Sequence, residues 1–223
     1  MQKIIIYFIL LFIPLRYNPF YRETTPEPAT TTYQQLYSEM QLENVVNYVI
    51  FELAMVGYDK LEVPNKEVVT LIDYSKPSTE ERLYVLNMKE KKLLFSSLVS
   101  HGKNSGADFA TSFSNKSGSH KSSLGFYVTG NTYLGGNGNS LILNGLEKGF
   151  NDRAKDRAIV IHAAKYCNAD YVSEHGMLGR SYGCPALPKE INDTIINTIK
   201  DGTLLFIYAN NQYYLSKSRL LRK

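Results

Sequence analysis

Apolar residues recur at two different spacings along this chain, and the change between them divides it into a helical part and a strand-rich part. Between residues 33 and 58 the apolar positions fall mostly at helical spacing, which predicts one or two helices ending near Gly57. From Val68 onward, short apolar runs separated by turn residues predict strands. These runs cover residues 68–74, 82–86, 93–100, 125–130, 140–144, 158–163 and 204–208, and residues 191–199 read as an amphipathic helix.

The first three predicted strands follow one another with short connections, which is typical of an antiparallel meander. We therefore expect a mainly β fold, a sandwich or barrel-like sheet with a few short helices and an N-terminal helical segment. Residues 102–123 are rich in Gly, Ser, Asn and Lys and should form a long irregular loop. Such loops are commonly functional or mobile.

The N-terminus carries a different signal. A short basic start precedes an apolar run of about a dozen residues at 4–15, typical of a signal-peptide core and shorter than the ~20 residues of a spanning helix. No clear Ala-x-Ala cleavage site follows, which leaves an uncleaved membrane anchor as the alternative. We expect export, with residues 1–18 as signal peptide or anchor, 19–32 as a Pro/Thr linker, 33–65 as a helical segment and 66–223 as the main body.

Composition excludes several function classes. The formal charge of +4 is mild and selects no partner by itself. The chain has neither a zinc-type Cys/His spacing nor a phosphate-binding glycine motif, so we expect no metal, no cofactor and no nucleic acid partner. No pattern in the sequence specifies an oligomeric state.

One turn carries the candidate chemistry. Cys184 is preceded by Ser181-Tyr182-Gly183 and followed by proline, and a glycine beside a thiol allows a tight turn that aims backbone N–H groups at the atom the sulfur attacks. The strand at 158–163 delivers His162 upstream. A thiol and an imidazole on adjacent elements are the minimum for a base-activated cysteine nucleophile.

The alternative role for Cys184 is structural, as one half of a disulfide. An exported protein uses paired cysteines in this way by default, and Cys167 is the only possible partner within the chain. The turn residues around Cys184 favour the nucleophile, while Cys167 has no comparable surroundings and is most simply an apolar filler.

Taken together, His162 and Ser181-Tyr182-Gly183-Cys184 resemble the signature of the L,D-transpeptidase catalytic domain family (YkuD-like). Residues 69–74 with 83–86 resemble the opening strands of that family, and residues 122–127 resemble its Thr-Pro-x-Gly-x-Phe/Tyr segment. The resemblance spans residues 66–210. Many members have His in place of Tyr182, and Arg or Asn in place of Ala186, so contacts made by those side chains cannot be carried over.

The resemblance implies a peptidoglycan enzyme of the bacterial periplasm or cell envelope and a carbapenem target. Cys184 would attack the stem tetrapeptide at its third residue, release D-Ala and pass the acyl group from a thioester to an amine. His162 would move the protons, oriented by a backbone carbonyl near Ala163. The N–H groups of Tyr182, Gly183 and Cys184 would stabilise the oxyanion.

Further candidates surround this pair. Arg180 suits a stem-peptide carboxylate. Ser181 is expected to shape the turn or to bond with His162 or substrate, Tyr182 and Tyr133 to line the groove, and His175 to be a second base or a solvated loop residue. Two other histidines, His101 and His120, read as surface loop residues.

Three rival functions stay open. With water as the acceptor the same site is an L,D-carboxypeptidase. A catalytically silent cell-wall-binding domain of the same fold would have a Cys167–Cys184 disulfide or an unreactive thiol. A papain-like amidase ranks last, because its cysteine precedes its histidine in the chain.

Overall fold

The computed structural model describes residues 32–222. The predicted signal peptide or anchor and residues 19–31 of the predicted linker lie outside these residues. Within the described part no helix is long and apolar enough to cross a membrane. The helices are α1 (Thr32–Glu39), α2 (Tyr48–Lys60), α3 (Ala169–His175), α4 (Lys189–Ile199) and α5 (Gln212–Lys217).

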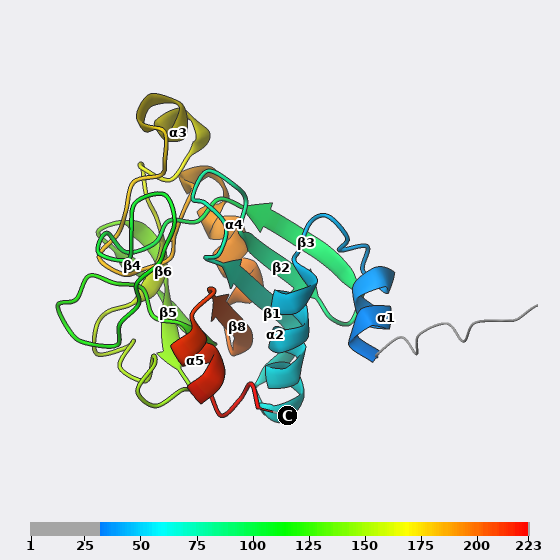
Figure 1. Ribbon diagram of the computed structural model, residues 1–223. Helices are drawn as coiled ribbons and strands as arrows, with labels where there is room; N and C mark the ends of the chain where they lie inside the picture. The colour runs from blue at the N-terminus through cyan, green and yellow to red at the C-terminus, as the bar shows by residue number, and fades with distance from the viewer. Residues whose placement is uncertain (1–31, 223) are drawn as a thin grey trace, which may run out of the picture. The chain divides into compact units, whose positions relative to one another are not determined.

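A single eight-stranded sheet forms the body of the domain (Figure 1). Its strands lie in the order β3-β2-β1-β8-β4-β5-β6-β7. The predicted meander is confirmed, because β1 pairs antiparallel with β2, and β2 with β3. The strands are β1 (Asn65–Asp73), β2 (Leu83–Asn87), β3 (Lys92–Ser97), β4 (Gly125–Gly135), β5 (Gly138–Gly145), β6 (Val160–Ala163), β7 (Ala186–Leu187) and β8 (Thr203–Tyr208).

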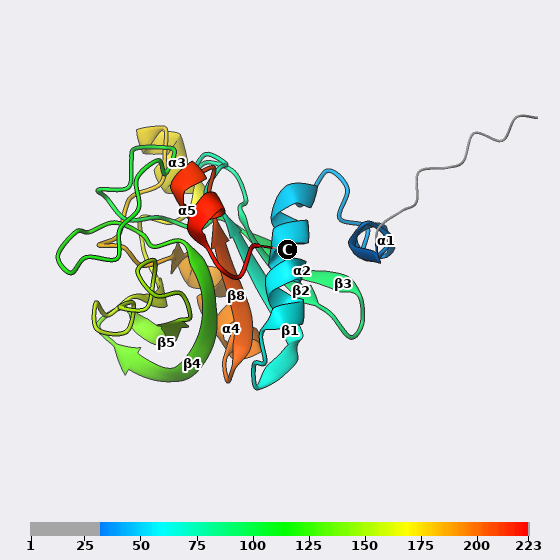
Figure 2. The same ribbon diagram turned by 60° about the horizontal axis from the view of Figure 1, so that its bottom comes forward.

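The two edges of this sheet meet, so that the sheet is nearly closed into a barrel. The segment after β3 forms an antiparallel bridge from Ser100 to Ala186 of β7, and β4 curls strongly around the interior (Figure 2). Closure brings residues 100–103 alongside the turn that contains Cys184, since Gly102 also bridges Ser181. The expected mainly β, barrel-like fold with a few short helices is confirmed.

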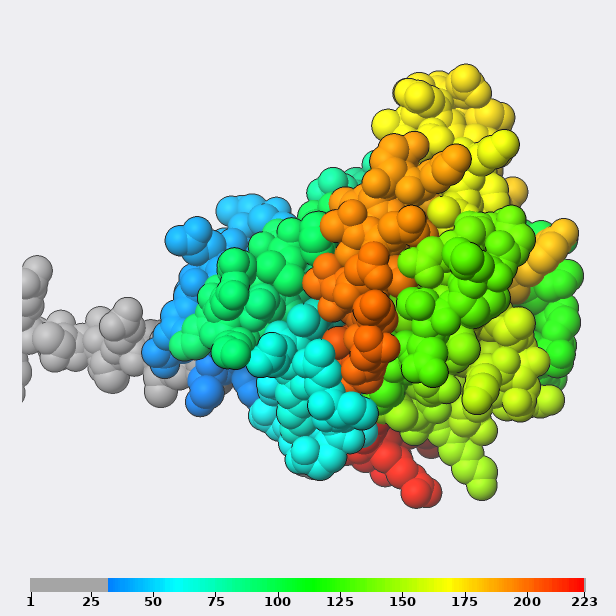
Figure 3. Space-filling view, turned by 180° about the vertical axis from the view of Figure 1, so that it is seen from behind, coloured from blue at the N-terminus to red at the C-terminus, as the bar shows by residue number. Residues whose placement is uncertain are grey.

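Helices cover the sheet on two faces. On the face turned to the viewer in Figure 1, α2 packs on β1 and β8, whereas α4 crosses the back of the domain and packs on β1, β5 and β6 (Figure 3). The buried face of α2 joins the same hydrophobic core as the sheet. At Gly57 the helix approaches Phe126 so closely that a Cβ would lie 2.2 Å from the ring.

Three elements were not predicted. Between the predicted strand at 158–163 and the cysteine turn lies α3, which is capped by the Asn168 side chain and ended by Gly176 at φ 74. This helix buries none of its residues, so it has no apolar periodicity that would reveal it. The strand β7 has only two residues, and α5 buries only Tyr214, so both give equally weak sequence signals.

Candidate active site

The imidazole of His162 is held between two neighbouring strands. In β6 this residue pairs with Ser140 of β5 and with Ala186 of β7, and its side chain is largely buried. Its Nδ1 lies 2.8 Å from the carbonyl oxygen of Ala163. A carbonyl only accepts hydrogen bonds, so Nδ1 carries the proton and Nε2 keeps the lone pair of a base. This carbonyl is the orienting group that the sequence suggested.

The cysteine turn is built around one serine hydroxyl. Ser181 Oγ donates to the Cys184 carbonyl at 2.6 Å and accepts from the Gly183 N–H at 3.0 Å. Gly183 has φ +126, and a Cβ there would lie 2.8 Å from the Lys121 carbonyl oxygen, so the turn requires glycine. Ser181 therefore shapes the turn, and its hydroxyl has no bond to His162.

The oxyanion donors differ from the expected set. The Gly183 N–H was expected to face the oxyanion, but it donates to Ser181 instead. Within residues 32–222 the N–H groups of Tyr182 and Cys184 have no acceptor. The cysteine turn thus has two unpaired backbone donors, one on each side of Gly183.

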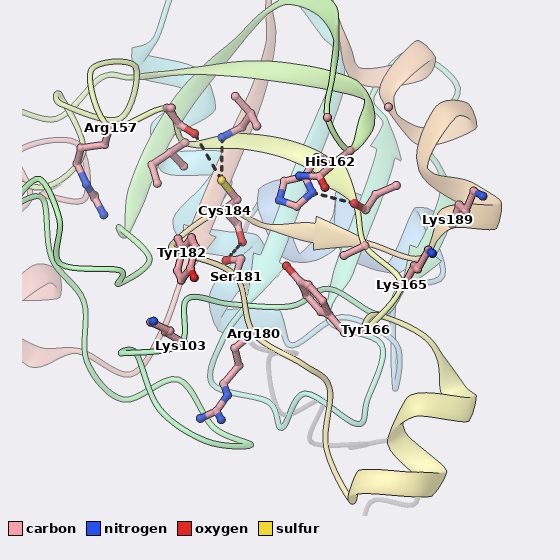
Figure 4. A pocket seen from close by; sticks show the side chains of 18 of the residues that line it. Lys103, Arg157, His162, Lys165, Tyr166, Arg180, Ser181, Tyr182, Cys184 and Lys189 are labelled. Atoms are coloured by element: carbon pink, nitrogen blue, oxygen red, sulfur yellow. Dashed lines mark hydrogen bonds between the residues drawn. The ribbon is translucent and has the colours of Figure 1, made fainter.

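The sulfur of Cys184 lies against the start of β6. Sγ accepts from the Val160 N–H and donates to the Ala158 carbonyl, both at 3.5 Å. Figure 4 shows the thiol and the His162 imidazole in one pocket, and among the described residues no hydrogen bond joins them. The parallel register explains why the two side chains are close. His162 pairs with Ala186 of β7, and Cys184 lies two residues before Ala186.

Burial raises the pKa of the Cys184 thiol, against the opposing effects of the Val160 N–H and the positive charge of Arg157. The group is therefore a neutral thiol at neutral pH. A thiol is a weak nucleophile, so a base must remove the proton during attack. The lone pair on Nε2 of His162 suits that role.

An open cleft of about 1130 Å³ surrounds the pair. Six of the predicted site residues line it: Cys184, His162, Ser181, Tyr182, Arg180 and Tyr133. Tyr182 is 67% exposed, its ring lies 4.5 Å from that of His120, and the Lys103 ammonium lies 4.5 Å from its centroid. Arg180 donates to the Gly106 carbonyl at 3.1 Å.

The structure does not bring His175 into this cleft. It ends α3, where its ring stacks on Tyr171 at a centroid distance of 3.9 Å and its Nδ1 lies 3.0 Å from the Tyr171 carbonyl oxygen. The solvated reading of this histidine is the one that the structure supports.

Sequence reasoning missed Arg157, which was not among the predicted site residues. Its guanidinium is half-buried, lines the cleft and donates to four oxygens of the loop at 102–123, among them the carbonyls of Ser114 and Lys121. This loop is thereby fixed behind the cysteine turn, where Ser122 Oγ also donates to the Gly183 carbonyl at 3.1 Å. The only feature of the sequence that could have pointed to Arg157 is its position five residues before His162, just ahead of β6.

His101 was expected on the surface and is buried, which is a second correction. Its Nδ1 lies 2.9 Å from the fully buried guanidinium of Arg82, and its carbonyl accepts from the Ser181 N–H at 2.9 Å. Burial and the Arg82 charge lower the pKa of His101 to about 4. The His101 ring is therefore neutral, and it is the backbone carbonyl of this residue that holds the cysteine turn.

Both cysteines are free thiols, so the disulfide alternative is wrong. Cys167 is buried and its Sγ donates to the Ala186 carbonyl at 3.1 Å. Burial raises the pKa of Cys167 to about 11. In the described part of the chain, no group of three or more His, Cys, Asp or Glu side chains is placed to hold a metal ion.

Replacing Ser181 with alanine should lower the rate at which the Cys184 thiol is acylated, although the thiol itself remains. The change leaves the Gly183 N–H and the Cys184 carbonyl without their buried partner, which typically costs about 1–3 kcal/mol. We expect the melting temperature to fall by about 2–4 °C per kcal/mol and acylation of Cys184 to slow by about tenfold or more, a loss of at least ~1.4 kcal/mol. Stopped-flow acylation and thermal melts measure both. Ser181→Thr keeps the hydroxyl and should restore most of the rate, and equal rates for Ser181→Ala and wild type would contradict this role.

Residues 42–208 match the L,D-transpeptidase catalytic domain family. The match begins ahead of α2, whereas the sequence resemblance was placed from residue 66. No curated protein sequence matches the chain.

Several solved structures are similar to this chain. An L,D-transpeptidase from Mycobacterium smegmatis is 13% identical, with 64% of this chain and 59% of that chain covered and a TM-score of 0.40. The helical cell shape determining protein Pgp2 from Campylobacter jejuni is 14% identical, with 71% and 56% covered and a TM-score of 0.41. An L,D-transpeptidase from Stackebrandtia nassauensis is 12% identical, with 81% and 77% covered and a TM-score of 0.41.

The chain thus spans less than two thirds of the length of the first two structures. The family match alone covers well over half of the chain, and it includes the histidine, the cysteine turn and every strand of the sheet. On that match, the chain belongs to the L,D-transpeptidase catalytic domain family.

Proposed function

We propose that this domain is a cysteine peptidyltransferase that cross-links peptidoglycan stem peptides. The observation that carries the proposal is a neutral thiol and an imidazole with a free Nε2 facing one open cleft. The donor is a stem tetrapeptide, cut between its third residue and the terminal D-Ala.

The first half-reaction forms a thioester. Cys184 Sγ attacks the carbonyl carbon of the third residue while Nε2 of His162 takes the thiol proton. The N–H groups of Tyr182 and Cys184 stabilise the oxyanion, and one such donor is typically worth about 2.7–4 kcal/mol. The C–N bond then breaks, the imidazolium gives its proton to the leaving amine, and D-Ala departs.

The second half-reaction reverses these proton transfers. An amine of another stem attacks the thioester and gives a proton to Nε2. The C–S bond breaks, and the sulfur recovers its proton from the imidazolium. If water replaces the amine, the same steps release a tripeptide, which is the L,D-carboxypeptidase alternative.

We also propose that the enzyme acts outside the cytoplasmic membrane. The substrate of the proposed reaction is a polymer of the bacterial envelope. The apolar run at residues 4–15 supports export to the periplasm or cell envelope, with that run as a cleaved signal peptide or as an anchor. Carbapenems, which acylate nucleophiles of this type, are the expected inhibitors.

Incubation with a purified disaccharide-tetrapeptide tests the proposal. We expect mass spectrometry to detect a dimer that has lost one D-Ala. A tripeptide product alone would indicate the carboxypeptidase. If neither product forms and a carbapenem leaves the protein mass unchanged, the domain is catalytically silent and the proposal is wrong.

A further inference from the structure

The walls of the cleft carry charge of one sign. Five cationic side chains line it: Lys103, Arg157, Lys165, Arg180 and Lys189. Among the described residues no Asp or Glu lines it, although acidic residues are nearly as numerous as basic ones in the whole chain. A cleft with one sign of charge attracts ligands of the opposite sign, so this cleft suits a peptide with free carboxylates.

These cations differ in how far the protein already uses them. The Arg157 guanidinium donates to four loop oxygens, Arg180 bonds to a carbonyl and Lys103 lies over Tyr182. The ammonium groups of Lys165 and Lys189 are exposed, and neither has an ion pair or hydrogen bond within residues 32–222. Two unpartnered cations at one end of the cleft are free to bind a ligand.

The strand register holds these two lysines together. Ala163 pairs with Leu187 in the parallel β6–β7 ladder, and each lysine follows its strand by two residues. Figure 4 shows both beyond His162, on the side of the imidazole away from Arg157 and Tyr182. Lys189 also lies in the first turn of α4, where the helix dipole disfavours a cation. Helix stability therefore does not account for a lysine at that position.

We propose that Lys165 and Lys189 bind the carboxylate of the residue that leaves the donor stem, an inference that rests on the proposed function. The imidazole must reach the leaving amine to protonate it, so the leaving residue lies on the imidazole side of the sulfur. In an amino acid the carboxylate is attached to the carbon that bears this amine. The two lysines are the cations beyond the imidazole, so they meet that carboxylate.

The consequence is selectivity for donor stems with a free C-terminal carboxylate. A tetrapeptide that ends in D-alaninamide has the same scissile bond and lacks the charge that the lysines would bind. Loss of a hydrogen bond to a charged group typically weakens binding by about ten- to hundredfold. We expect wild-type protein to prefer the acid over the amide by that factor in kcat/KM for D-Ala or D-alaninamide release.

A double variant, Lys165→Gln with Lys189→Gln, tests the assignment. We expect the acid-to-amide ratio to fall to near one, chiefly through a higher KM for the acid. The matched control is Lys89→Gln with Lys91→Gln, which removes the same charge from the exposed β2–β3 turn and should keep the wild-type ratio. Thermal melts and alkylation of Cys184 by iodoacetamide, a neutral reagent, check that the fold and thiol are intact.

Two results would overturn the inference while leaving the proposed function standing: equal use of acid and amide by wild-type protein, or an unchanged ratio in the double variant. If wild-type protein releases neither D-Ala nor D-alaninamide, the proposed function fails, and the lysine assignment fails with it.

Discussion

Cys184→Ala should abolish acyl transfer. Of the two thiols in the chain, Cys184 lines the cleft, whereas Cys167 is buried and bonded to the Ala186 carbonyl of β7, so Cys184 is the thiol that can form the thioester. Removing the nucleophile of a covalent mechanism costs about 10⁴-fold or more. We expect no product above background from tetrapeptide and no mass increase with a carbapenem. Turnover assays and intact-mass spectra measure the two effects.

Cys167→Ala provides the matched control. It removes the same chemical group from a buried position outside the cleft, with one hydrogen bond to Ala186. We expect it to lower stability modestly and to change the acylation rate by only a few-fold. The fold of Cys184→Ala should match wild type in circular dichroism, since this side chain is small, only partly buried and lines the cleft. Turnover retained by Cys184→Ala would end the enzyme proposal.

The second large effect is expected from His162→Ala, which removes the base. Because burial raises the pKa of the Cys184 thiol, only a small fraction of the variant is thiolate near pH 7. Without the base, only this fraction reacts. Acylation near pH 7 should slow by about 10²–10⁴-fold, the usual range for a general base. In the variant the rate should rise about tenfold per pH unit until the pH passes the raised thiol pKa, because the thiolate fraction grows in that proportion.

The wild-type profile should be much flatter across the same range, since the imidazole removes the proton during attack. Stopped-flow carbapenem acylation from pH 6 to 10 gives both profiles. His175→Ala is the matched control, because this histidine lies on α3 outside the cleft, and it should follow wild type. Parallel profiles for wild type and His162→Ala would show that the imidazole is not the base.

Local patterns predicted most of the fold. The strands of the meander are short apolar runs and the helix α4 has a periodic apolar face, and both contribute residues to the core. The pairing of β1 with β8 and the bridge from Ser100 to Ala186 join residues far apart in the chain, and no local pattern records such partners. Closure of the sheet is therefore a property that only the three-dimensional structure shows.

The site divides in a similar way. Residue types and turn chemistry were enough to single out Cys184, His162 and Ser181. The surroundings of His101 and Arg157 were not predictable, because each depends on partners from other parts of the chain, Arg82 in one case and residues 114–123 in the other. The Gly183 N–H was misassigned because the Ser181 hydroxyl competes for it, and only atomic geometry decides such a competition.

The most direct measurement is the intact mass of wild-type protein quenched in acid within seconds of mixing with tetrapeptide, followed by peptide mapping. We expect one adduct with the mass of the stem lacking D-Ala, carried by the peptide that contains Cys184 and discharged by an added amine. Cross-linked product without any adduct on that peptide would contradict a covalent mechanism at this cysteine.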